Sequence, residues 1–143
     1  MSDTKPFPRG LLSLVLFLAG CTSTPVVPAT GTGTATGKVT GSVTYRERIA
    51  LPPSAVVTVK LVDVSLADAP AVLIAEQVLV AAGRQVPFEF ALAYDVSRIQ
   101  PSHTYAVQVR IEDGGKLLFI SDTVNRVITR DAPNHLDIVV RRA

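Results

Sequence analysis

The sequence is poor in the residues that most often carry chemistry, with one cysteine, Cys21, and two histidines, His103 and His135. A single cysteine excludes an internal disulfide, and in an exported protein a lone cysteine requires another explanation. Neither histidine has a cysteine or carboxylate beside it at the spacing of metal ligands, so the sequence predicts no metal site and no cofactor. Both histidines lie in turn-like segments, which favours surface positions.

Motifs for catalysis are also lacking. No nucleophile elbow occurs, and Gly31, Gly33 and Gly37 alternate with threonines without preceding a helix, so they form no phosphate-binding loop. A triad of one histidine, a serine and Asp63 stays open as an alternative, although no motif points to it. We expect a protein that is not an enzyme and has no small-molecule substrate.

The charges are nearly balanced, with 14 Lys and Arg against 12 Asp and Glu, a formal net charge of +2. Arg46 and Arg48 flank Glu47, and no stripe of basic residues interleaved with aromatic residues follows. A protein that tracks a phosphate backbone needs such a stripe. The sequence therefore predicts no nucleic-acid partner.

A long hydrophobic run is absent, because the apolar stretch Leu11–Leu18 is far shorter than the ~20 residues that a helix needs to cross a bilayer. Lys5 and Arg9 precede this stretch, and small residues follow it. A basic start, a short apolar segment and small residues are the order of a cleaved secretory signal. We predict that residues 1–20 are this signal.

The residues Leu18-Ala19-Gly20-Cys21 resemble a bacterial lipobox. This resemblance implies cleavage between Gly20 and Cys21 and a lipid on Cys21, whose chains would each contribute ~0.8 kcal/mol per buried methylene to membrane binding. By the sorting rules of Gram-negative bacteria, Thr22 after the cysteine implies the periplasmic face of the outer membrane. The alternative, a short core strand with an inert cysteine, does not account for the basic start.

Residues 21–37 follow as a predicted tether. From Thr22 to Gly37 nearly every residue is Thr, Ser, Pro, Ala or Gly, with no charge and no periodic apolar face. Such a composition is typical of a flexible linker. We expect it to hold a folded domain away from the membrane.

Residues 38–143 are predicted to form one all-β domain, because short segments with apolar residues at every second position alternate with turn residues. About seven or eight strands at this spacing favour an antiparallel β-sandwich of immunoglobulin or transthyretin type. Residues 71–80 are predicted as a strand, with a helix as the alternative. The expected strands are residues 39–45, 55–65, 71–80, 86–94, 105–112, 116–120, 124–129 and 136–142.

Two details of this domain are predicted from single residues. Pro87 removes an amide donor and should therefore lie at a strand end or edge. Asp63 has the same parity as Val59 and Leu61, so it points toward their apolar face. Because a buried unpaired carboxylate is costly, we expect Asp63 to cap a turn or meet an arginine, with a partner-binding or catalytic role as the alternative.

Three stretches together resemble the YbaY/YscW lipoprotein family: Val39 to Pro53 with its Leu51-Pro52-Pro53 turn, Val59 to Ser65, and Val86-Pro87-Phe88 with Phe90. The resemblance covers about residues 38–143 and implies a small β-sandwich. One branch of the family acts as pilotins, lipoproteins that bind the C-terminal tail of an outer-membrane secretin and carry it to the membrane for type III secretion. The matching residues are explained by folding, so the resemblance identifies no partner-binding residue.

Two hypotheses for function follow. In the first, the domain binds a protein or peptide in the periplasm, for example by adding a strand to an exposed sheet edge, and a secretin pilotin is its most specific form. In the second, the protein is a structural or stress-related lipoprotein of the cell envelope with no dedicated peptide ligand.

Overall fold

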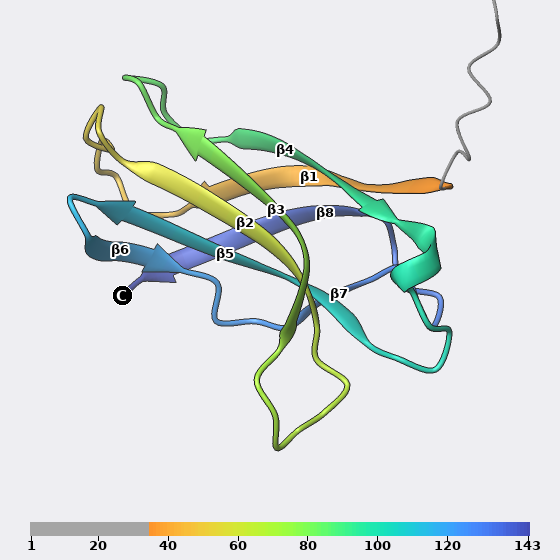
Figure 1. Cartoon of the computed structure of the whole chain (residues 1–143). Helices are drawn as coiled ribbons and strands as arrows, with labels where there is room; N and C mark the ends of the chain where they lie inside the picture. The colour runs from red at the N-terminus through yellow and green to blue at the C-terminus, as the bar shows by residue number, and fades with distance from the viewer. Residues whose placement is uncertain (1–34) are drawn as a thin grey trace, which may run out of the picture. The chain divides into compact units, whose positions relative to one another are not determined.

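The computed structural model describes residues 35–143, which form eight strands and one short 3₁₀ helix around a single interior (Figure 1). The predicted signal, the Gly20–Cys21 cleavage site and the tether up to residue 34 lie outside the described residues. The elements are β1 (Thr36–Tyr45), β2 (Val56–Asp63), β3 (Val72–Val80), β4 (Phe88–Asp95), η1 (Val96–Arg98), β5 (Tyr105–Asp113), β6 (Lys116–Ile120), β7 (Asn125–Val127) and β8 (His135–Arg142).

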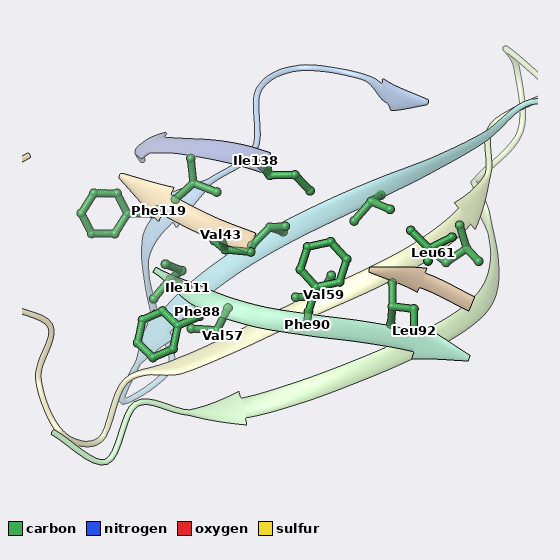
Figure 2. Packing of buried hydrophobic residues seen from close by; sticks show 14 of the residues in the cluster. Val43, Val57, Val59, Leu61, Phe88, Phe90, Leu92, Ile111, Phe119 and Ile138 are labelled. Carbon is green, nitrogen blue, oxygen red and sulfur yellow. The ribbon is translucent and has the colours of Figure 1, made fainter. Parts of the chain in front are cut away.

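The strands form because their apolar residues recur at every second position. In β4, Phe88, Phe90 and Leu92 are buried, whereas Glu89 and Ala91 between them are exposed. Side chains of this inward set from several strands pack against one another and fill the interior (Figure 2). Each large side chain that is fully buried in this way stabilises the fold by roughly 1.5–3 kcal/mol relative to an exposed one.

One mixed sheet contains all eight strands, in the order β3-β2-β5-β6-β8-β1-β4, and β7 pairs with β5 beyond the end of β6. The prediction of an all-β domain with seven or eight strands is therefore confirmed. The prediction of a wholly antiparallel sandwich is wrong, because β1 and β8 run side by side in the same direction (Figure 1). The sheet curves instead until it nearly closes into a barrel.

Gly41 makes the parallel contact between β1 and β8 possible. It lies opposite Leu136, and a Cβ atom at position 41 would overlap the Leu136 carbonyl oxygen and press on the Phe90 ring. A residue without a side chain is therefore required where the two backbones and the aromatic ring meet.

β3 and β4 are the two ends of the strand order, and side chains rather than a backbone ladder join them. The Ala91 N–H donates to Oε1 of Gln77 over 2.8 Å. The Arg98 guanidinium donates to the carbonyl oxygens of Leu73 and Ile74, both over 3.0 Å. These three hydrogen bonds close the last side of the barrel, which we call the seam.

The predicted segments agree well with the observed strands. Residues 71–80 form a strand and not a helix, and Pro87 immediately precedes edge strand β4, as predicted. β1 begins at Thr36, so Gly37 belongs to the strand rather than to the predicted tether. β7 is shorter than the predicted 124–129, because Ile128 has a φ of 72°, which takes the chain out of the extended conformation.

Candidate functional site

One outer face of the barrel is polar. It consists of the outward-facing residues of β1, β4 and β8, and we call it the polar face. In its centre the Thr40 hydroxyl lies 3.0 Å from Nδ1 of His135, and the Ser42 hydroxyl donates to Asp137 over 2.7 Å. The neighbouring strands place these groups directly opposite one another. These four polar groups therefore bind each other in two pairs.

The outer face of β3, β2 and β5 differs, because apolar side chains lie exposed on it. The register aligns outward-facing residues in rows across the three strands, and Val78 and Val80 on β3 are 56% and 51% exposed. Val124, in the segment between β6 and β7, is 64% exposed. We call this surface, together with Ile120, Val124 and Arg126, the apolar face. Its rows contain Val80, Val56 and Glu112; Val78, Thr58, Arg110 and Ile120; Glu76, Lys60 and Gln108; and Leu73, Val62, Ala106 and Arg126.

A hollow of about 530 Å³ lies on the apolar face over β5. Ala106 lines it and is only 2% exposed although it points away from the interior. Ile120 and Val124 line one side of the hollow, and Arg110 and Arg126 also contribute to its wall. The hollow is thus partly apolar, with cationic side chains among its lining groups.

The hollow exists because the chain leaves the sheet between β6 and β7. Residues 121–124 form no ladder with β5, although the Ser121 N–H donates to the Val109 carbonyl over 2.9 Å, and two side chains provide further hydrogen bonds. The Ser121 hydroxyl accepts from the Val109 N–H over 3.0 Å, and the Asn125 amide donates to the Val107 carbonyl over 3.2 Å. This edge of β5 therefore offers no free backbone groups to a further strand.

The cations of the apolar face differ in their partners. Lys60 pairs with Glu76 over 3.6 Å, and Arg110 pairs with Glu112 over 2.9 Å. Arg126 is exposed and makes no ion pair with any of residues 35–143. The face thus carries an arginine whose charge is not compensated by a neighbour.

Asp63 lies at the end of β2 and joins two loops of the barrel. Its carboxylate accepts from the N–H and hydroxyl of Ser65 over 2.9 and 2.5 Å, and its second oxygen is 2.6 Å from Nδ1 of His103. Burial alone would raise the pKa of Asp63, but the hydrogen bonds from Ser65 and His103 outweigh it and hold that pKa below its usual value. The predicted turn cap is present, and the expected arginine is replaced by a histidine.

These three residues do not have the arrangement of a catalytic triad. In a triad the serine hydroxyl donates to the histidine, which removes its proton. Here both Ser65 and His103 bind the Asp63 carboxylate, and the Ser65 oxygen also accepts from the Thr104 N–H over 2.8 Å. The cluster fastens the loop after β2 to the loop before β5.

The remaining candidates from the sequence are the two histidines and the predicted cleavage and lipidation site. His135 is exposed at the start of β8 and lies beside Thr40, whereas His103 is half-buried and lies against Asp63. Among residues 35–143, no three His, Cys, Asp or Glu side chains are grouped so that they could hold a metal ion. In the same range, no helix is long and apolar enough to cross a membrane. Cys21 and Gly20 lie outside the described residues.

Comparison with known proteins decides the family. The model of the family described as "Type III secretion system lipoprotein chaperone (YscW)" matches residues 34–140, which is most of the chain. The chain belongs to the YscW family. The resemblance seen in its sequence motifs is thereby confirmed, and the proteins of the matching family are described as chaperones rather than enzymes.

Two relatives extend this assignment. The YscW-family chain is 42% identical over 92 residues to the uncharacterised lipoprotein YbaY of Escherichia coli (strain K12), a match that covers 64% of this chain and 48% of YbaY. It thus spans about half the length of that curated relative. It also resembles a solved alternative pilotin of the type II secretion system of Vibrio cholerae, with 56% identity and a TM-score of 0.72 over 74% of this chain and 96% of that chain.

The apolar face and its hollow were not predicted from the sequence of this YscW-family protein. A signal existed in Ser121-Asp122-Thr123, three polar residues between two strand patterns, which marks a break in the sheet edge. The exposure of β3 had no comparable signal, because its run of apolar residues does not distinguish an inward from an outward side chain.

Proposed function

We propose that this protein is a pilotin-like lipoprotein that binds a segment of an outer-membrane secretin and helps to bring the secretin to the membrane. The 56% identity to the Vibrio cholerae pilotin, over 96% of that chain, is the observation that carries the proposal. That relative serves a type II secretion system, so a type II secretin is the partner that we favour over a type III secretin.

In this proposal the mature protein begins at Cys21, whose lipid anchors it at the periplasmic face of the outer membrane, and residues 22 to about 35 tether the barrel. The YbaY relative, which is named a lipoprotein, supports the anchor. The anchor is needed because the barrel can bring a bound secretin to the outer membrane only if the barrel is itself attached to that membrane.

Deleting the gene in its own organism tests the proposal. Secretin multimers should then be lost from the outer membrane or appear in the inner membrane, and the full chain should restore them. The Cys21→Ala chain should still bind the secretin but leave it misplaced, because the complex lacks its anchor. Correct placement of secretins in the deletion strain would contradict the proposal and favour a structural role in the envelope.

A further inference from the structure

We infer, on the basis of the proposed function, that the apolar face is the docking surface for the secretin, and that the docked segment is an amphipathic helix with apolar residues on one side and carboxylates at its border. This inference names the binding surface and the chemistry of the partner, neither of which follows from family membership.

The first reason is the distribution of exposed apolar residues. Val78, Val80 and Leu73 on β3, together with Val124, are exposed on one surface, while the polar face opposite carries groups that bind each other. Apolar side chains gathered on one outer face of a small domain commonly mark an interaction site. The hollow over Ala106 offers a place on this surface where a large apolar side chain can insert.

The second reason is that the interior is filled and that side chains already bind backbone groups at the seam and along β5. The interior is filled by packed side chains (Figure 2). At the seam, Gln77 and Arg98 already hold backbone groups of β4 and β3, and Ser121 and Asn125 do the same along β5. A partner that added a strand at the seam or along β5 would have to displace these side chains.

A helix fits a surface that has no free backbone groups, because its own backbone hydrogen bonds are internal. From the row of Val56 to the row of Val62 the face is about six residues long, or ~20 Å at ~3.3 Å per residue. A helix of about 13 residues covers that length at 1.5 Å per residue. The rows of β3, β2 and β5 give it a width of about two strand spacings, ~10 Å, which matches the diameter of one helix.

The positive charge at the hollow favours acidic residues at the border of the docked helix. Arg126 has no ion-pair partner among the described residues, and it lies at the hollow together with Arg110. An acidic residue of the partner next to Arg126 would form a pair that the free protein lacks. A basic partner would meet uncompensated positive charge at the same place.

Fluorescence anisotropy with the full lipidated chain in detergent tests the inference, using labelled synthetic peptides that tile the C-terminal tail of the organism's type II secretin. Val78→Asp, Val124→Asp and Arg126→Glu should each weaken binding of the best peptide at least about tenfold. Val96→Asp and Lys38→Glu are matched controls, since Val96 and Lys38 are exposed outside the apolar face, and they should change binding less than about twofold. All five variants should keep the unfolding temperature of the wild type.

Two further measurements make the outcome decisive. A peptide whose acidic border residues are changed to lysine should bind the Arg126→Glu chain better than the wild type, and circular dichroism should detect helix formation in the bound peptide. If Gln77→Ala alters binding while the three face variants do not, the seam is the site and the inference is wrong, although the proposed function stands. If no peptide binds the wild-type chain, both are overturned.

Discussion

The two outer faces of the barrel are built from the same kind of strand but differ in what their side chains do. On the polar face, Ser42 and Asp137 lie opposite each other and form a hydrogen bond. On the apolar face, Val78 and Val80 point outward and contribute nothing comparable to the fold. The proposed docking of a partner would account for apolar residues that are exposed and contribute little to folding.

One of the two largest expected effects concerns the contact between β1 and β8 beneath the polar face. Gly41→Ala should destabilise the protein by about 3 kcal/mol, because the new methyl group overlaps the Leu136 carbonyl and the Phe90 ring. Chemical denaturation monitored by fluorescence or circular dichroism measures the loss. Ser42→Ala, one position further, is the control and should cost about 1 kcal/mol or less. Equal stability of the Gly41→Ala and wild-type chains would refute the close approach of β1 and β8.

The interior and the apolar face should respond differently to the loss of an apolar side chain. Leu92→Ala leaves a cavity in the core and should cost about 2–5 kcal/mol. Val78→Ala removes an exposed side chain and should change stability by less than about 0.5 kcal/mol. Comparing both by the same denaturation experiment sharpens the distinction between folding and binding residues. A large loss in Val78→Ala would mean that the apolar face serves the fold.

The hydrogen bonds of Asp63 at the end of the barrel predict that the free energy of unfolding depends on pH. Because the pKa of Asp63 is lower in the folded protein than in the unfolded chain, its contribution is complete above the unfolded value of about 3.9 and is lost as the pH falls through the folded value. Asp63→Asn should therefore cost about 1–3 kcal/mol at neutral pH and little at the lowest pH. Denaturation curves of both chains between about pH 7 and pH 2 measure this. A difference that stays constant with pH would contradict the role of the carboxylate charge.

Among the variants that remove a contact of the fold, the smallest effect is expected at the seam. Gln77→Ala removes the acceptor of the Ala91 amide and should cost about 1 kcal/mol. Hydrogen exchange followed by NMR should report faster exchange of the Ala91 amide, while amides in the centre of β5 keep their protection. Unchanged protection of Ala91 would mean that backbone pairing, rather than Gln77, closes the barrel.

The sequence was informative wherever structure depends on neighbours along the chain. The alternation of Phe88, Phe90 and Leu92 predicted β4. The turn between β5 and β6 is equally local, because Gly114 and Gly115 both adopt positive φ there. Pairing between distant segments was not predictable in the same way. Period two assigns residues to faces but does not give the direction of the neighbouring strand, so the parallel contact of β1 with β8 was missed.

The same distinction between neighbouring and distant residues applies to the candidate sites. A turn cap at Asp63 was predicted because a buried unpaired carboxylate is costly, and Ser65, two residues away, provides it. His103 reaches Asp63 only through the fold. Arg126 and Ala106 meet at one hollow because β7 pairs with β5, and the sequence did not predict that pairing. Contacts between residues close together in the chain could be inferred from the sequence. Which residues of distant strands meet on one surface could not.

Site-specific photo-crosslinking in living cells tests the central claim most directly. A photo-reactive amino acid placed at position 124 or 78 of the full chain should form a covalent adduct with the secretin, identified by mass spectrometry. The same amino acid at position 38 or 42 on the polar face should not. Adducts with the secretin only from positions 38 and 42, or no secretin adduct from any of the four, would contradict the account.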